Sequence, residues 1–141
     1  MTRYVTKRMA LVINQMCVGL TGGYAANTRS NIRGGLSLGF VDRIFVNEFF
    51  GETLYPSLFH QASAYMFYII KDHVFLDGNK RTGLLCAVTF LEWNSIDFKP
   101  FDEDKVFDFV MEVAGGPNRP ETEIPWIAAW LESLSVPAPP S

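Results

Sequence analysis

Apolar residues recur at helical spacing in one segment after another, and this feature most constrains the fold. The clearest segment runs from Leu58 to Asp72, with apolar side chains on one face: Leu58, Ala62, Tyr65, Met66, Ile69 and Ile70. Pro56 and Ser57, just before it, are typical of a helix start. The segment from Lys80 to Trp93 is apolar nearly all round between Leu84 and Leu91, which is typical of a buried central helix, and Asn79 is placed to cap it.

Weaker helical patterns surround these two segments. They run from Met9 to residue 19 with Met9, Val12, Ile13 and Met16 on one face, from Leu36 to Phe49, from an Asp102 cap to Gly115, and from about Thr122 to Leu134. Phe50–Tyr55 is expected to be extended or turning. Because no alternating run is long enough for a sheet, we predict an all-α fold, a compact bundle of about six helices with a short extended flap before the central helices.

The length of 141 residues fits one domain, and 48% hydrophobic residues are enough to form its core. We expect a single domain over residues 1–135 and a flexible Pro-rich tail over residues 136–141. Trp126 and Trp130 are expected to anchor the core, and His60 to be an ordinary surface residue.

Charge and composition argue against several classes of partner. Twelve Lys and Arg residues against fifteen Asp and Glu give a formal net charge of −3, so we expect no nucleic-acid partner. Asn14 and Gln15 interrupt the apolar stretch near the N-terminus, so we expect neither a secretion signal nor a membrane span. Cys17 and Cys86 lie singly in apolar runs and are expected to be core thiols of a reduced, cytoplasmic protein.

Polar residues gather between the two most apolar segments, from His73 to Gly83. A loop of this kind, opening into the N-terminus of a buried helix, has the parts of an anion site. Gly78 allows close backbone approach, Lys80 and Arg81 add positive charge, and Asp77 is suited to holding a hydrated Mg²⁺ between phosphate oxygens. His73 is suited to taking a proton from an incoming hydroxyl, because an imidazole titrates near neutral pH.

Each of these features also has an interpretation without a ligand. His73 is placed to cap the preceding helix by binding its last carbonyls, and Asp77, Gly78 and Asn79 are common turn and cap residues. Lys80 and Arg81 are harder to explain in this way, because cations in a first turn oppose the helix dipole, at a cost of up to about 1 kcal/mol. From the residues alone, an anion site and an ordinary turn both stay open.

The string HVFLDGNKRTG resembles the signature of the Fic/Doc (Fido) family. That signature is HxFx(D/E)GNxRxxR in the branch that transfers AMP and HxFxxANKRTA in the death-on-curing (Doc) toxins. The shared positions are filled by His73, Phe75, Asp77, Gly78, Asn79 and Arg81. Similarity extends over about Leu54 to Phe98, and the family fold is a compact helical domain, which agrees with the helical pattern.

The resemblance implies a role for each motif residue. The family's histidine activates a hydroxyl of the target protein, so His73 would be the general base. Its acid binds Mg²⁺, so Asp77 would be the metal ligand, and Phe75 would fix the loop against the core. Binding of the nucleotide phosphates would fall to the residues at the helix start: Gly78, Asn79, Lys80 and Arg81.

Two positions favour the Doc branch of the family. Lys80 replaces a glycine of the AMP-transferring branch, and Leu84 replaces its second arginine. The resemblance therefore implies a toxin that phosphorylates a Ser or Thr hydroxyl with ATP and Mg²⁺, with elongation factor Tu as the protein substrate and inhibition of translation as the result. Gly78, where the Doc signature has alanine, keeps AMP or nucleotidyl transfer as an alternative. A silent domain that binds nucleotide or a partner without turnover is a third.

The resemblance also implies a regulator and an alignment device. No glutamate here has Ser or Thr four residues before it, so the inhibitory (S/T)xxxE(G/N) motif of many AMP-transferring members is missing. Inhibition would then come in trans, from an antitoxin whose disordered tail folds on binding. Family members align the target chain with an extended flap, which we place at Phe49–Tyr55, with Arg33 and Arg43 as candidate helpers.

Overall fold

The computed structural model describes residues 1–21, 32–34 and 36–137 of the chain. Within these ranges it contains six helices and two very short strands: α1 (Lys7–Thr21), α2 (Phe40–Val46), β1 (Glu48–Phe49), β2 (Glu52–Thr53), α3 (Leu58–Lys71), α4 (Asn79–Trp93), α5 (Glu103–Gly115) and α6 (Pro120–Leu134). The all-α class and the helix number predicted from the sequence are confirmed.

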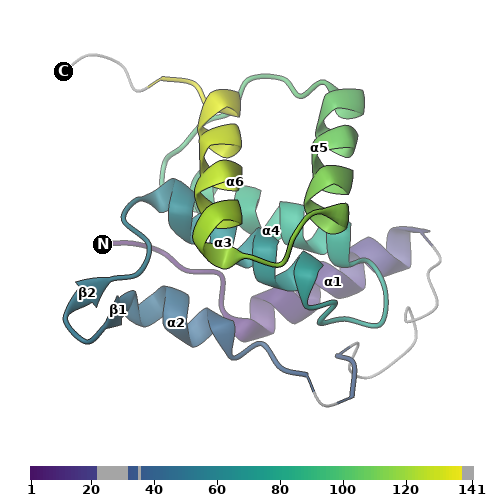
Figure 1. Cartoon of the computed structure of the whole chain (residues 1–141). Helices are drawn as coiled ribbons and strands as arrows, with labels where there is room; N and C mark the ends of the chain where they lie inside the picture. The colour runs from purple at the N-terminus through teal and green to yellow at the C-terminus, as the bar shows by residue number, and fades with distance from the viewer. Residues whose placement is uncertain (22–31, 35, 138–141) are drawn as a thin grey trace.

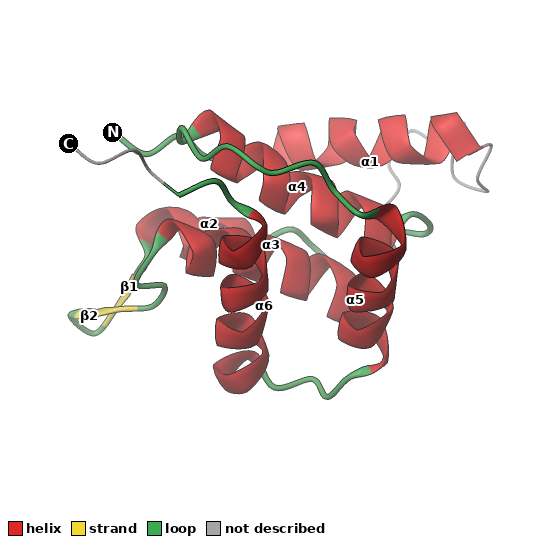
Figure 2. Cartoon of the chain, turned by 90° about the horizontal axis from the view of Figure 1, so that it is seen from above, coloured by secondary structure: helices red, strands yellow, loops and turns green. Residues whose placement is uncertain are grey.

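Helices α3 and α4 pack against each other at the centre of the domain, and α5 and α6 lie on one side of them (Figure 1). Figure 2 shows α1 running alongside α4, so the start of α4 lies between α1 and α5. No helix of the described residues is both long and apolar enough to cross a membrane.

Helix α3 is the most enclosed element. It begins after Ser57, whose hydroxyl oxygen accepts a hydrogen bond from the backbone N–H of His60 at 3.2 Å, as the cap pattern predicts. Its predicted apolar face lies in the core, together with the polar side chains of Gln61 and Ser63. Helix α4, predicted to be buried nearly all round, instead leaves Leu85 exposed.

Helix α1 buries a face other than the predicted one. Met9, Val12 and Met16 are 36%, 50% and 61% exposed, whereas the buried side chains are Ala10, Asn14, Cys17 and Val18. Small side chains on the buried face let α1 lie close to α4, and this orientation turns the polar Asn14 inward. The periodicity identified the helix correctly and its buried face wrongly, because a burial rule based on hydrophobicity discounts a buried asparagine.

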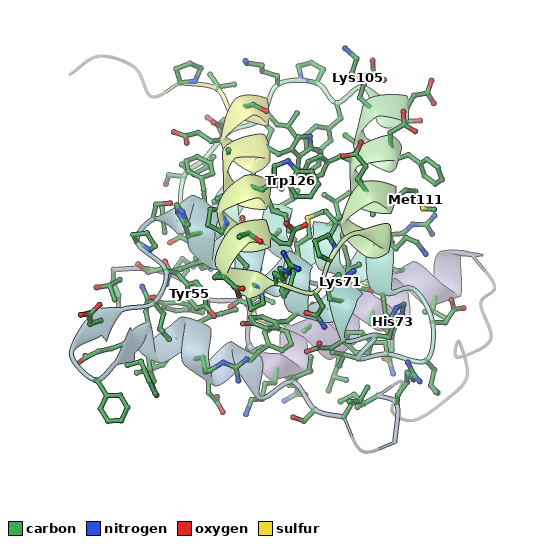
Figure 3. All side chains as sticks on the ribbon, in the orientation of Figure 1. Tyr55, Lys71, His73, Lys105, Met111 and Trp126 are labelled. Carbon is green, nitrogen blue, oxygen red and sulfur yellow. The ribbon has the colours of Figure 1, made fainter. Side chains whose placement is uncertain are left out.

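The segment predicted as a helix over Leu36–Phe49 is helical only in α2. Asn47 ends the helix in the left-handed conformation, with φ 54°. An antiparallel hairpin follows, pairing Glu48 with Thr53 and Phe49 with Glu52, so the expected extended segment is confirmed. It lies before α3, whereas His73 lies after α3, and Figure 3 shows Tyr55 and His73 on opposite sides of the molecule.

Helix α6 and the residues directly after it contact other parts of the domain. Trp130 stacks on Phe109 of α5 with ring centroids 4.0 Å apart, while Trp126 is 38% exposed and lies at the edge of this contact. Val136, predicted to start a flexible tail, donates its backbone N–H to the carbonyl of Asp97 at 2.7 Å. Residues 138–141 of the predicted tail lie outside the described residues.

Candidate active site

The loop between α3 and α4 is anchored by one aromatic side chain and one amide. Phe75 is fully buried, as predicted for its structural role. The Asn79 side chain accepts a hydrogen bond from the N–H of Phe75 and donates one to its carbonyl, both at 2.9 Å. Asn79 therefore holds the loop and is not the side-chain cap that the sequence predicts; the cap position belongs to Gly78, and Asn79 is the first helical residue.

Gly78 occupies a position that other residues fit poorly. Its φ is 76°, in the left-handed region, and a Cβ there would lie 3.1 Å from Val18 Cγ2 and 3.4 Å from Asn14 Nδ2. The turn and its close contact with α1 therefore both favour glycine, whatever reaction the site performs.

Asn14 of α1 fixes the other side of the loop. This side chain is fully buried and donates from Nδ2 to the carbonyl of Asp77 at 2.9 Å and to Oγ1 of Thr82 at 3.1 Å. It links α1, the loop and the first turn of α4. This role was not predicted from the sequence, although an asparagine inside an otherwise apolar stretch was the available signal.

The extended chain beside the loop is not the predicted flap. Ile32 forms an antiparallel bridge with Phe75, and the N–H of Arg33 donates to the carbonyl of Val74 at 2.9 Å. The β1–β2 hairpin lies at the far end of α3 instead. Of the two candidate helper arginines, Arg33 reaches the His73 carbonyl at 3.5 Å, whereas Arg43 lies over the ring of Tyr68, 5.1 Å from its centroid.

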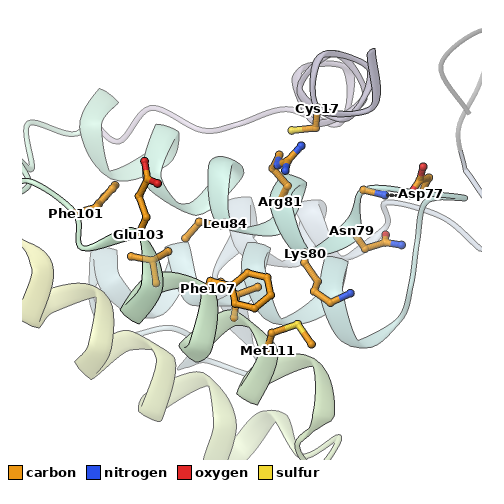
Figure 4. Close-up of a pocket in the computed structure, with 13 residues that line it drawn as sticks. Cys17, Asp77, Asn79, Lys80, Arg81, Leu84, Phe101, Glu103, Phe107 and Met111 are labelled. Atoms are coloured by element: carbon orange, nitrogen blue, oxygen red, sulfur yellow. Dashed lines mark hydrogen bonds between the residues drawn. The ribbon is translucent and has the colours of Figure 1, made fainter. Parts of the chain in front are cut away.

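A pocket of about 800 Å³ opens at the start of α4 (Figure 4). The loop and α4 contribute one wall: Asp77, Gly78, Asn79, Lys80, Arg81 and Leu84. Cys17 of α1 borders it, and the opposite wall is mostly apolar and comes from α5 and the residues before it: Phe101, Glu103, Val106, Phe107, Val110 and Met111. The pocket thus joins a polar, cationic end to an apolar one.

Lys80 and Arg81 are the strongest sign of an anion ligand. Both are exposed in the first turn of α4, which has no acidic residue there. Within the described part of the chain, neither side chain forms a hydrogen bond or an ion pair. Their charges add to the positive end of the helix dipole, so an anion in the pocket would be stabilised by both.

Asp77 is the only carboxylate that the loop contributes to the pocket, and one of its oxygens accepts from the N–H of Gly78 at 2.8 Å. The described residues hold no cluster of three or more His, Cys, Asp or Glu side chains able to bind a metal. A single carboxylate fits a Mg²⁺ ion whose other ligands are phosphate oxygens and water, and it does not fit an ion held by protein side chains alone.

His73 lies beside the other predicted site residues without bordering the pocket. It follows the last residues of α3 in the left-handed conformation, with φ 46°, and its backbone N–H points to the carbonyl of Ile70. The helix end is therefore satisfied by the backbone, and the exposed imidazole makes no hydrogen bond to the described residues. The ring therefore does not cap α3 in the way that the alternative interpretation predicts, and it is accessible from solvent.

The predicted core thiols are confirmed as free and buried. Burial raises the pKa of the Cys17 thiol, and a hydrogen bond with Thr82 and the charge of Arg81 lower it by less. Cys17 is therefore protonated at neutral pH and is a wall of the pocket, not a nucleophile.

These observations define a small helical domain with a pocket at the start of a central helix, where two exposed cations border it. The Fic/DOC family model matches residues 4–91, which is more than half of the chain, and the chain belongs to the Fic/DOC family. The match covers α1 to α4 up to Leu91, whereas α5, the apolar wall of the pocket, lies outside it.

A curated relative agrees with this assignment. The chain is 38% identical over 66 residues to a protein of Mycolicibacterium smegmatis (strain ATCC 700084 / mc(2)155) named Toxin Doc. The aligned part covers 46% of this chain and 51% of the relative, so it spans about half the length of each protein.

Proposed function

We propose that the protein is a Doc-type toxin that transfers the γ-phosphoryl group of ATP to a Ser or Thr hydroxyl of a protein substrate. Elongation factor Tu is the substrate to test first. Its phosphorylation would inhibit translation. The observation that carries this proposal is the pair of exposed cations, Lys80 and Arg81, in the first turn of α4 beside a pocket. The family membership and the relative named Toxin Doc support it.

In this reaction the hydroxyl oxygen of the substrate bonds to the γ-phosphorus as the bond from that phosphorus to the β–γ bridging oxygen breaks, and ADP leaves. His73 takes the hydroxyl proton. Lys80, Arg81 and the backbone amides at the start of α4 stabilise the charge on the phosphate oxygens. Mg²⁺, held by Asp77 and the phosphates, would supply further neutralisation.

Two residues of α4 favour phosphoryl transfer over AMP transfer. Leu84 lies one helical turn after Lys80, and both border the pocket, so the pocket carries a lysine and an apolar side chain where the AMP-transferring signature has glycine and a second arginine. Gly78, the residue that kept AMP transfer open, is explained by its backbone conformation and its contact with Val18. Glycine at this position is therefore weaker support for AMP transfer than the motif alone gives.

The apolar wall of the pocket supports a regulator in trans. Phe107 and Met111 are 63% and 44% exposed along it, and exposed apolar surface of this kind is typical of a site that a partner covers. An antitoxin segment that folds against α5 would bury these side chains and block the pocket. Toxicity of the chain should then disappear when the gene of that antitoxin is expressed with it.

The test is transfer of label from ATP carrying ³²P at either the α or the γ position, with a cell extract and purified elongation factor Tu as acceptors. We expect protein label from the γ position only, and none with His73→Ala. His60→Ala is the matched control, because His60 is the other histidine of the chain and its ring bonds Ser57, away from the pocket. It should retain transfer.

Label from the α position would identify an AMP transferase and contradict the kinase proposal. Absence of label from both positions, with ATP binding retained, would favour a domain that binds nucleotide or a partner without turnover. Lys80→Gly combined with Leu84→Arg tests the branch residues: γ transfer should fall sharply, and unchanged γ transfer would show that these positions do not select the reaction.

A further inference from the structure

We propose that the tip of the β1–β2 hairpin is a docking contact for the folded protein substrate, seated in an apolar cavity of that substrate rimmed by basic residues. This inference rests on the proposed function, because it assigns a second contact to the same protein that is modified at the pocket. It concerns four residues, here called the hairpin tip: Phe49, Phe50, Gly51 and Glu52.

The hairpin tip exposes two adjacent aromatic rings. Phe49 is 62% exposed and Phe50 is 90% exposed, and their rings contact each other edge to face with centroids 4.4 Å apart. Neither ring packs on the core cluster of the domain. Two phenylalanines presented together in solvent cost solubility without stabilising the fold, which is typical of a surface that a partner buries.

Backbone strain at the tip also argues for a function. Phe50 and Gly51 form the two-residue turn, with φ of 50° and 82°. Such a turn requires positive φ at both positions and is normally made by Asn, Asp or Gly. A phenylalanine with positive φ at the first position raises the energy of the turn, and the fold does not require it. Residues kept in such a strained backbone conformation concentrate at functional sites.

The base of the hairpin holds the tip in a fixed position. Asn47 accepts from the N–H of Tyr55 at 2.7 Å and donates from its side chain to the Tyr55 carbonyl at 2.9 Å, while its own carbonyl accepts from Leu54. Tyr55 is buried beneath this junction. The rings are therefore presented in a defined direction before binding, which lowers the entropy cost of docking.

The negative charges beside the rings indicate the kind of partner that binds the hairpin tip. Glu48 and Glu52, both exposed, flank the rings, and no cation accompanies them on the hairpin. A second copy of this chain, docked tip to tip, would bring four carboxylates together, and an anionic lipid surface would repel the same pair. A protein cavity rimmed by Lys or Arg is the complementary occupant.

A partner that contacts both the hairpin tip and His73 must be larger than a short peptide, because α3 separates the two places. The hairpin precedes α3 and His73 follows it, and α3 has 14 residues, or about 21 Å at 1.5 Å per residue. A segment of a few residues around the modified hydroxyl cannot reach both places. The tip would therefore set selectivity among protein substrates through a contact remote from the reaction.

The experiment measures phosphoryl transfer to purified elongation factor Tu as a function of its concentration. For Phe49→Ser/Phe50→Asn and for Glu48→Lys/Glu52→Lys we expect kcat/KM to fall about ten-fold or more, mainly through a higher KM. Glu121→Lys, an exposed charge reversal on α6, should leave both constants unchanged. Calorimetric ATP binding should be the same in all variants, because the pocket is untouched.

Thermal unfolding separates docking from a structural role. Phe50→Asn relieves the strained turn, so it should raise the unfolding midpoint while weakening transfer; a purely structural residue would lower both. Unchanged kcat/KM in the tip variants would overturn the proposal.

Photo-cross-linking decides the proposal even if the wild-type protein transfers no label and the proposed function fails. With p-benzoylphenylalanine at position 50, we expect a cross-link to elongation factor Tu that the His73→Ala protein retains. Cross-links to a second copy of the chain, binding to phosphatidylglycerol vesicles, or no cross-link to elongation factor Tu would each overturn the docking role.

Discussion

The side-chain amide of Asn79 hydrogen-bonds both backbone polar groups of Phe75, accepting from its N–H and donating to its carbonyl at 2.9 Å each. The bond pair closes the loop in front of α4 into a fixed turn, and Ile32 bridges the same residue from outside. Only a side chain with both a donor and an acceptor makes this pair. The geometry of the pocket entrance therefore depends on this amide group.

Replacing that amide should open the loop. Asn79→Asp keeps the acceptor but removes the donor and sets a carboxylate against the Phe75 carbonyl, so we expect a loss of about 1–3 kcal/mol in the free energy of unfolding and loss of transfer. Hydrogen exchange of the Phe75 amide measures the opening. Asn94→Asp is the matched control, because Asn94 bonds both backbone groups of Arg3 in the same way. Asn94→Asp should lower the free energy of unfolding by a similar amount but should not speed up hydrogen exchange of the Phe75 amide.

The sequence predicted which residues gather at this site better than it predicted the hydrogen bonds that they make. The loop from His73 to Gly83 was identified because polar residues there interrupt two apolar helices. The capping role of Asn79 was predicted wrongly, since an asparagine at a helix start has the same pattern whether it caps the helix or binds the preceding loop. The role of Asn14 depends on contact with residues more than sixty positions away, and no local periodicity carries that information.

A similar limit explains the misplaced flap. Phe50–Tyr55 was correctly predicted to be extended or turning, but its distance from His73 is set by the direction of α3. Ile32 and Arg33 lie beside the loop through a single bridge, which leaves no alternating pattern in the sequence. Helix starts at Ser57 and Asp102 were predicted correctly because caps act within three residues.

The buried Asn14 should be necessary for the shape of the site. Asn14→Leu leaves the Asp77 carbonyl and the Thr82 hydroxyl without this donor, and we expect a loss of about 1–3 kcal/mol with reduced ATP affinity. Adding Thr82→Val removes one of the two groups that lost this donor, so the double variant should be less destabilised than the sum of the two single variants. Gln15→Leu, an exposed neighbour, is the control. Strict additivity in chemical denaturation would contradict this coupling.

Lys71 should control the attachment of α5, the apolar wall of the pocket. Its ammonium donates to the carbonyls of Ala114 and Gly116 at the end of α5, a helix with only Val110 and Val113 fully in the core. Lys71→Met should cost about 1–3 kcal/mol, because the bonds are made by a charged donor.

Tryptophan fluorescence reports this change, since Trp130 stacks on Phe109 of α5. We expect the emission of the Lys71→Met protein to change before global unfolding. Lys105→Met, at the exposed start of α5, should leave both stability and emission near those of the wild type. A change of emission only together with global unfolding would show that α5 does not depend on Lys71.

Asp72 should make stability depend on pH in the acidic range. Asp72 is exposed, but partial desolvation at the end of α3 raises the pKa of its carboxyl, and the charges of Arg43 and His73 lower it by less. With a raised pKa, the folded state favours the protonated form, so the stabilisation is complete below the unfolded pKa of about 4 and is lost as pH rises through the folded value. At neutral pH the carboxylate also lies at the negative end of the helix dipole.

Asp72→Asn should therefore raise the unfolding midpoint at pH 7, and its advantage over the wild type should shrink as pH falls toward about 4. Asp108→Asn removes one negative charge from an exposed position on α5 and serves as the control for net charge. Thermal unfolding followed by circular dichroism from pH 4 to pH 8 measures the difference. An advantage that stays constant over this range would show that Asp72 acts through something other than its ionisation, because only the ionised form carries the cost.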